Sequence, residues 1–367
     1  MSAASVNFNS VVLVTGAAGW LASVLAQELL ADLKTPNLHL ILADIVEPKA
    51  PAGARAVTIK ADLTQKASLD QLFQTDFGVP DTIYALHGIM SRGCEDNFDL
   101  GLKVNVDSVR LLCETARQYR PAAGAPIKFI FTSSLAVYGG SLPEIVTPST
   151  LATPESAYGM GKLVSELFIN EYSRRGFIDG RIVRLPTIVV RPGAPASATS
   201  SFLSGDFISL ISLSLSLLSY HYLLFRLSGI IREPLKGLDA ICPIGESPDS
   251  PALGLKVWLA SPETTIANLV IARHVPAAAF LPHTRVVCLP GFSATVRELL
   301  QALAHVAGPD ALARVRFEDS PTDRRIVASW PSRFDNSYAL SLGFIADDGG
   351  MVPIVERFKK AVEDGKA

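Results

Sequence analysis

The sequence Val11-Val-Leu-Val-Thr15-Gly-Ala-Ala-Gly19-Trp-Leu-Ala22 joins a short β-branched apolar run, a glycine turn and the beginning of a helical pattern. Such a run is suited to a strand that is buried on both faces of a parallel sheet. Gly16 permits the tight turn, and Gly19 lets a phosphate approach the backbone N–H groups at the helix start. Ala22 occupies the third small position. Strand, glycine turn and helix in this order predict a dinucleotide-binding unit.

The pattern of alternating strands and helices continues beyond this unit. Further strands are expected over residues 38–43, 57–61, 81–87, 127–132 and 180–185, with amphipathic helices between them. This alternation predicts an α/β fold, a Rossmann-type doubly wound parallel sheet, with a smaller C-terminal substrate lobe. We expect residues 1–186 to form the NAD-binding domain with the catalytic residues, and 187–367 to form mainly the substrate-binding lobe, with a helix over 293–303.

Acidic residues follow two of the expected strands. Asp44 lies about as far from the glycine turn as a carboxylate that binds the adenosine ribose hydroxyls. It would repel a 2′-phosphate, so the sequence favours NAD over NADP. Asp62 ends the next strand and is expected beside the adenine.

A tyrosine and a lysine, Tyr158 and Lys162, are four residues apart and therefore share one face of a helix. A phenol is a poor base at neutral pH because its ordinary pKa is about 10, and a neighbouring cation lowers that value. The pair therefore indicates a proton acceptor. Ser134 follows the strand at 127–132 and is expected to bind the reacting oxygen, with Ser133 as the near alternative because the register is open.

Bulk composition excludes several other classes of protein. The chain of 367 residues has 49% hydrophobic residues and a formal net charge of −2, which gives no reason to expect nucleic acid. Its four cysteines show no CxxC spacing, and His87 has no partner at metal-ligand spacing, so no metal site is expected. The first residues lack the basic-then-apolar pattern of a signal peptide, and the cytoplasm is the expected location.

Taken together, these motifs resemble the extended short-chain dehydrogenase/reductase family, its NAD-dependent epimerase/dehydratase branch. Besides the glycine turn, the resemblance rests on Thr-Ser-Ser-Leu-Ala-Val-Tyr-Gly at 132–139 and Tyr-Gly-Met-Gly-Lys at 158–162. Within that branch, Arg184-Leu-Pro-Thr-Ile-Val-Val-Arg-Pro-Gly and Gly229-Ile-Ile-Arg-Glu-Pro most resemble the D-erythronate dehydrogenases. Those enzymes oxidise the 2-hydroxyl of a four-carbon sugar acid with NAD.

The resemblance implies a role for each motif residue. Tyr158 would take the substrate proton, Lys162 would hold the nicotinamide ribose, and Ser134 would bind the reacting oxygen. Arg191 and then Arg232 are the candidates for a substrate carboxylate, with Ser91 adding a hydrogen bond. The expected cofactor contacts are Gly16, Gly19, Trp20, Leu21, Asp44, Ile45, Asp62, Leu63, Leu86, Asn105, Ser133, Tyr158, Lys162, Pro186 and Thr187. A homodimer through the helices that bear Asn105 and Tyr158 is also implied.

An apolar Leu/Ser-rich stretch, 205–228, interrupts the best-matching segment. Residues 207–225 contain no Lys, Arg, Asp or Glu and meet the minimum length of a membrane span. The stretch is otherwise interpreted as a lipid- or partner-facing helix. The leading hypothesis is that it is not native to the fold, since it is low in complexity and reads like translated non-coding sequence.

Other functions use similar residues. A nucleotide-sugar epimerase needs the same Ser, Tyr and Lys but returns the hydride to its substrate. A dehydratase would place an acid pair after Ser134, where this chain has Leu135 and Ala136. A membrane-associated hydroxysteroid-type dehydrogenase depends on the 205–228 stretch alone. A non-catalytic NAD-binding protein would have no need of Tyr158.

Overall fold

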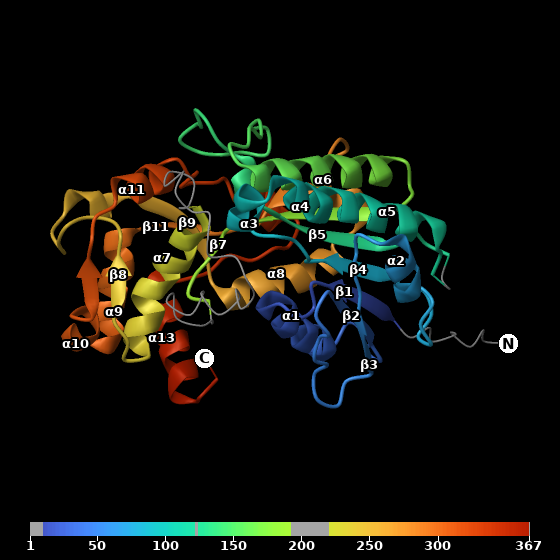
Figure 1. Cartoon of the computed structure of the whole chain (residues 1–367), viewed down its shortest axis with the longest axis horizontal. Helices are drawn as coiled ribbons and strands as arrows, with labels where there is room; N and C mark the ends of the chain where they lie inside the picture. Colours follow the sequence, from blue (N-terminus) through green and yellow to red (C-terminus); the bar gives the residue numbers. More distant parts are fainter. Residues whose placement is uncertain (1–9, 122–123, 192–219, 367) are drawn as a thin grey trace, which may run out of the picture.

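A parallel sheet forms the centre of the computed structural model, which describes residues 10–121, 124–191 and 220–366 (Figure 1). In the described part of the chain the sheet has seven strands in the order β10-β6-β5-β4-β1-β2-β3. The strands are β1 (Val11–Thr15), β2 (His39–Asp44), β3 (Ala56–Lys60), β4 (Thr82–Ala85), β5 (Lys128–Ser134), β6 (Asp179–Leu185) and β10 (Val286–Cys288). The strand order reverses between β1 and β4, where doubly wound sheets bind their ligands.

Helices cover both faces of this sheet. On one face lie α1 (Trp20–Ala31) and α8 (Pro262–His274), and on the other α2 (Lys66–Leu72), α5 (Ser108–Gln118) and α6 (Ala157–Arg174). Strand residues alternate between the two cores because successive side chains point to opposite faces. Val12 and Val14 pack with the α1 and α8 side, whereas Val11 and Leu13 pack with the other.

The second lobe lies at the left of Figure 1, beyond α3 (Ser91–Asp96) and α8. It has a three-stranded sheet in the order β11-β9-β7 and a two-stranded sheet of β12 and β8. Its elements are β7 (Thr187–Ile188), β8 (Ala240–Cys242), β9 (Lys256–Ala260), β11 (Phe292–Thr295), β12 (Val315–Phe317), α7 (Tyr220–Leu235), α9 (Val296–Ala307), α10 (Pro309–Leu312), α11 (Pro321–Ala328) and α13 (Met351–Glu363). Ile231, Leu299, Leu303, Ile354 and Phe358 are among its core residues.

The fold class expected from the sequence is confirmed, with two refinements. The first domain also contains segments from beyond residue 186, the boundary expected from the sequence. Helix α8 packs on α1, and β10 pairs with β6 in the first sheet. The helix expected over 293–303 begins at Val296, since Ser293 to Thr295 pair with β9. Thr295 and Glu298 form the capping box that starts this helix.

The apolar stretch 205–228 lies mainly outside the described residues, so its interpretations remain hypotheses. Its last residues belong to α7, in which Ser228 is fully buried. Among the residues that the structure describes, no helix combines the length and apolarity that a bilayer crossing needs.

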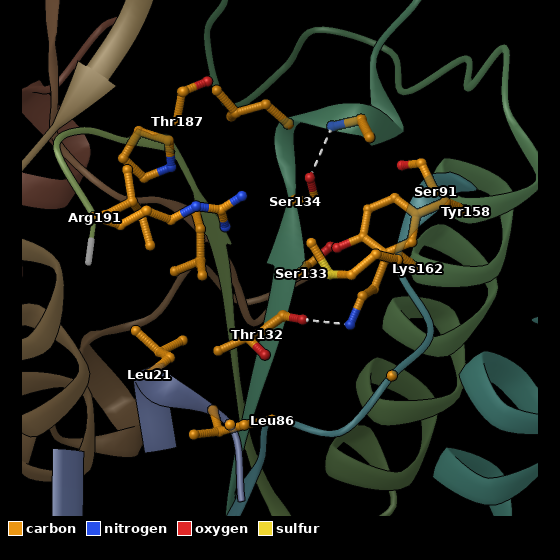
Figure 2. Close-up of a pocket in the computed structure, with 18 of the residues that line it drawn as sticks. Leu21, Leu86, Ser91, Thr132, Ser133, Ser134, Tyr158, Lys162, Thr187 and Arg191 are labelled. Atoms are coloured by element: carbon orange, nitrogen blue, oxygen red, sulfur yellow. Dashed lines mark hydrogen bonds between the residues drawn. The ribbon is translucent and has the colours of Figure 1, made fainter. Parts of the chain in front are cut away.

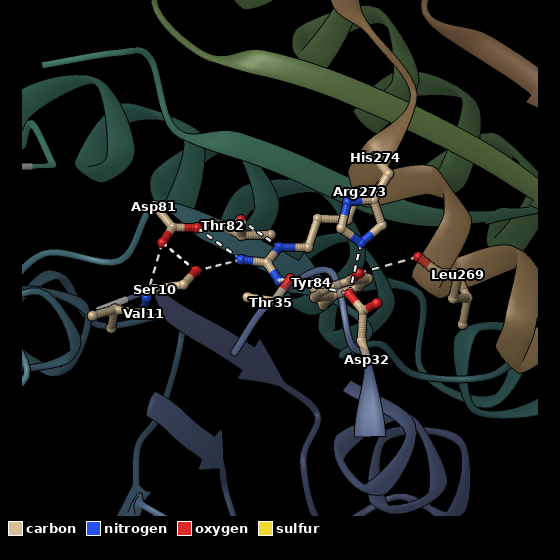
Figure 3. Close-up of polar contacts among 10 residues, drawn as sticks. All are labelled: Ser10, Val11, Asp32, Thr35, Asp81, Thr82, Tyr84, Leu269, Arg273 and His274. Carbon is tan, nitrogen blue, oxygen red and sulfur yellow. Dashed lines mark hydrogen bonds and ion pairs between the residues drawn. The ribbon is translucent and has the colours of Figure 1, made fainter. Parts of the chain in front are cut away.

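A buried arginine anchors α8 to the beginnings of the sheet strands, at the edge opposite the carboxyl ends (Figure 3). Arg273 donates to the hydroxyls of Thr82 at 3.1 Å, Thr35 at 2.9 Å and Ser10, and pairs with Asp81 at 3.3 Å. The next residue, His274, is hydrogen-bonded to Asp32 at 2.7 Å.

Replacing this arginine is expected to lower stability without touching the chemistry. Arg273→Met keeps the apolar stem but leaves its partners unsatisfied, so the free energy of unfolding should fall by about 2–3 kcal/mol in urea denaturation. Arg314→Met is the control, because Arg314 is half-exposed and lies 3.6 Å from Asp239. The free energy of unfolding of this control variant should fall by no more than about 0.5 kcal/mol. Equal losses in the two variants would contradict the anchoring role.

Candidate active site

A cavity of about 320 Å³ opens at the carboxyl ends of the central strands (Figure 2). Its lining brings together residues from the turns after β1 and β4, from β5, β6, α1 and α6, and from the second lobe. Of the residues expected from the sequence, it contains Gly16, Gly19, Trp20, Leu21, Leu86, Ser91, Ser133, Ser134, Tyr158, Lys162, Pro186, Thr187 and Arg191. Asp44, Ile45, Asp62, Leu63, Asn105 and Arg232 are not part of this lining.

The glycine turn forms the floor of the cavity near β1. Gly16 has φ +70°, and a Cβ there would lie 2.7 Å from the backbone nitrogen of His87. Any larger residue is therefore strained and blocked. Gly19 precedes the first turn of α1, which contains no acidic side chain. The N–H groups at this helix start therefore offer an anion site.

Three predicted cofactor residues make contacts that the sequence does not reveal. The Asp44 carboxylate accepts from the Ala18 N–H at 3.0 Å, which ties β2 to the glycine turn. The Asp62 carboxylate accepts from the backbone and hydroxyl of Thr64. Asn105 lies in a π-helical turn, and its amide bonds both backbone groups of Ile89 at 2.8 Å. It thereby holds the loop after β4.

Ser134 and Tyr158 meet at one wall of the cavity. Ser134 ends β5 and also accepts from the Ala136 N–H at 3.1 Å. Tyr158 lies in the first turn of α6, which the Ser156 side chain caps. Burial raises the pKa of Tyr158 to about 12, while its hydrogen bond with Ser134 and the charge of Arg191 oppose that rise. The sequence predicted a lowered pKa for this phenol, whereas burial raises it in the protein without its cofactor.

The position of Lys162 explains why the phenol is not acidified in the protein alone. Its ammonium donates to the Thr132 carbonyl at 2.9 Å and lies 5.7 Å from the centroid of the Tyr158 ring. Burial lowers the pKa of Lys162 to about 8, and Cys94 and Glu166 oppose that change. His87, behind the wall, is hydrogen-bonded to Thr15 and Ser108, and burial and the Lys162 charge lower its pKa to about 3. A packing role for His87 agrees with the sequence interpretation.

The two arginines expected to bind a carboxylate have different positions. Arg191 reaches into the cavity opposite Tyr158 (Figure 2). Arg232 is fully buried on α7, pairs with Glu233 at 2.6 Å and donates to the Arg191 carbonyl at 3.4 Å. Arg232 therefore holds the backbone of Arg191 in place and does not itself line the cavity. Burial and the Arg232 charge together lower the pKa of Arg191.

Comparison with known proteins agrees with this site. Residues 12–209 match the NAD dependent epimerase/dehydratase family. The chain belongs to this family. It is 40% identical to the D-erythronate dehydrogenases of Haemophilus influenzae and Cupriavidus necator, over 92% of this chain and 95% and 94% of theirs. The chain is thus an NAD-dependent oxidoreductase.

Solved structures of other dehydrogenases and epimerases have a similar fold. A nucleoside-diphosphate-sugar epimerase from Agrobacterium tumefaciens superposes with a TM-score of 0.80 at 31% identity, over 100% of this chain and 99% of that one. A GalE-like L-threonine dehydrogenase from Cupriavidus necator gives 0.73 at 19% identity, over 96% and 99%. At that identity the second likeness concerns the fold alone.

The residues present fit the NAD on which the family depends. Gly16 and Gly19 line the cavity at the start of α1, where backbone N–H groups with no acidic side chain in the first helical turn can bind a pyrophosphate. Asp44 stands at the end of β2, beside the same turn. Lys162 and Thr187 line the cavity farther along, where the nicotinamide half would lie.

Sequence reasoning missed the aromatic side of the cavity. Trp258 from β9 and Trp330 after α11 both contribute to its lining. They come from the distant second lobe and belong to no motif. Only the nonlocal packing of β9 on β7 brings Trp258 near the catalytic residues.

Proposed function

We propose that this family member oxidises the 2-hydroxyl of a small sugar acid, D-erythronate or a close analogue, to the 2-oxo acid with NAD. The two dehydrogenase relatives support this substrate class. The observation that carries the proposal is the position of Arg191 opposite Tyr158 across the cavity, which places a cation where it can pair with the carboxylate of a small acid.

The proposed chemistry follows from the positions of the side chains. Tyr158, as phenolate, takes the proton of the substrate hydroxyl. The Ser134 hydroxyl, which contacts the phenol, binds the same oxygen and stabilises the charge that develops on it. Lys162 contributes a positive charge and would hold a cofactor hydroxyl. NAD, when bound, supplies the hydride acceptor and additional positive charge near the phenol.

The substrate carboxylate would pair with Arg191, which presents two donors in a planar fork. Ser91 offers a further contact: its hydroxyl is buried at the cavity wall and has no hydrogen-bond partner among the described residues. Arg232 acts only through Arg191, whose carbonyl it binds.

The test is NADH production by the purified protein with NAD and a panel of four- to six-carbon sugar acids. Absorbance should rise with at least one four-carbon acid. No NADH from any member of the panel, in protein that binds NAD, would overturn the proposal. An epimerase, the function of the Agrobacterium relative, would interconvert a nucleotide sugar without net NADH.

Arg191→Gln is expected to lower kcat/KM for the sugar acid by roughly 10²-fold, because a desolvated charge pair is worth about 2–5 kcal/mol. The kcat/KM for the corresponding neutral polyol should be low in both wild type and variant, and the substitution should change it far less. Arg333→Gln, which changes an exposed arginine, is the control. Equal losses for acid and polyol would show that Arg191 does not bind the carboxylate.

We also propose a cytoplasmic homodimer that pairs through α6 and the helix bearing Asn105. On this side Phe98 and Leu167 are more than half exposed, which suits an apolar interface. None of the four cysteines is joined in a disulfide, as expected in a reducing compartment. Light scattering would report the mass, and Leu167→Glu should shift it to that of a monomer.

A further inference from the structure

A buried ion pair lies directly behind the catalytic residues. Both oxygens of Glu166 accept from Arg184, at 2.9 Å from Nε and 2.6 Å from Nη2. Glu166 also accepts from the Ser133 hydroxyl at 2.5 Å, and Arg184 donates from Nη1 to the Tyr138 hydroxyl at 2.6 Å. All four side chains are more than nine-tenths buried.

These contacts connect every backbone segment that carries a catalytic group. Ser133 precedes Ser134 on β5, and Glu166 follows Lys162 by one turn of α6. Tyr138 ends the short turn that Ser134 caps. Arg184 lies on β6, directly beside Ser133 in the sheet register. One carboxylate therefore joins the end of β5 to α6 and, through Arg184, to β6.

A need for stability does not explain such a pair. Burying two charges costs about as much as their attraction returns, and apolar residues of similar volume commonly serve as well. The geometry offers a different reason, since the distance between Ser134 and Lys162 depends on how β5 and α6 are held together.

We propose that Glu166, together with Arg184, is a positioning residue that holds the β5 end bearing Ser134 in register with the α6 turn bearing Lys162. It acts on the chemistry through these two residues and contacts neither substrate nor cofactor. This inference rests on the Tyr158, Ser134 and Lys162 chemistry proposed above.

The charge of Glu166 has a second effect at Lys162. It raises the pKa of Lys162 against burial, as does Cys94 from α3. The other titratable groups that face Lys162 are Tyr158 on its own helix and His87 after β4, which stays neutral. Without the Glu166 carboxylate, Lys162 should lose its proton at lower pH.

The test compares Glu166→Gln with the double variant Glu166→Gln/Arg184→Gln. The single variant leaves a buried arginine charge unpaired and is expected to be unstable, whereas the double variant removes both charges and should fold. In the double variant we expect kcat to fall by about 10²-fold, because misplacing a catalytic group by about 1 Å has effects of that size. The KM for NAD should change little, and the alkaline limb of the kcat profile should move to lower pH.

Glu171→Gln is the matched control, since Glu171 is also on α6 but is exposed and, within the described part of the chain, pairs with Arg174 and Arg175. A double variant with the kcat and pH profile of the wild type would overturn the positioning role and leave a structural one.

A second measurement keeps this inference separate from the proposed substrate. Competitive acetylation at a series of pH values, followed by mass spectrometry, reports the pKa of individual lysines without any substrate. The double variant should show a lower pKa at Lys162, while the acetylation of Lys103 stays that of the wild type; an unchanged Lys162 would contradict the inference. If the wild type oxidises no sugar acid, the proposed function fails while this measurement still decides the role of Glu166.

Discussion

Tyr158→Phe is expected to lower NADH production by about 10²–10⁴-fold while NAD affinity stays near that of the wild type. The substitution removes one oxygen, the only proton acceptor in the proposed mechanism, and contributions of this size are typical of a general base. The ring still fills its buried place at the start of α6. Steady-state rates with saturating substrate, together with NAD titration by calorimetry, measure the two quantities separately.

Tyr172→Phe provides the matched control for this result. Tyr172 lies on the same helix, and its hydroxyl donates to Glu114 at 2.8 Å, far from the cavity. It should retain its activity. Substantial turnover by Tyr158→Phe would mean that another group takes the proton, and the proposed mechanism would fall.

Gly159→Ala is expected to reduce activity to a similar degree and to destabilise the protein by roughly 3 kcal/mol, at the upper end of overpacking effects. A Cβ at Gly159 would lie 2.0 Å from the Ala136 carbonyl oxygen and 2.8 Å from its carbon. Both are backbone atoms, so no side chain can move aside. Helix α6 would have to separate from the turn after β5, and Tyr158 would move away from Ser134.

Gly161→Ala tests whether this effect is specific. It lies in the same turn of α6, but among the described residues its Cβ would meet side-chain atoms alone, Asn105 Cβ at 3.3 Å and Val106 Cγ2 at 3.6 Å. Removing a helical glycine stabilises by up to about 1 kcal/mol, which offsets a mild contact. Thermal unfolding and kcat of the two variants decide the matter: wild-type values for Gly159→Ala would show that the contact is not tight.

Local sequence was sufficient for the parts of the fold that follow one another along the chain. The glycine turn, Asp44 at the end of its strand, the strand that carries Ser134 and the helix that carries Tyr158 are short-range patterns, and these elements lie where they were expected. Nonlocal pairing was not predictable. Three residues, Val286–Cys288, carry too weak a pattern to reveal that β10 completes the first sheet.

The site shows the same division between local and nonlocal information. The spacing of Tyr158 and Lys162 predicted that they share a helix face, but the pKa of Tyr158 depends on burial, which spacing does not report. Arg232 was the second candidate for the substrate carboxylate after Arg191, yet it pairs with Glu233 and does not line the cavity. Likewise, no local signal connects Glu166 with Arg184.

The late arrival of β10 affects how the protein is made. A ribosome releases β6 long before it has added Val286–Cys288, so the nascent sheet has an unsatisfied edge during much of translation. Such an edge readily pairs with strands of other chains. A truncated polypeptide that ends before β10 would therefore be prone to aggregate. Slow synthesis between the two strands would lengthen the time for which newly made chains need chaperones.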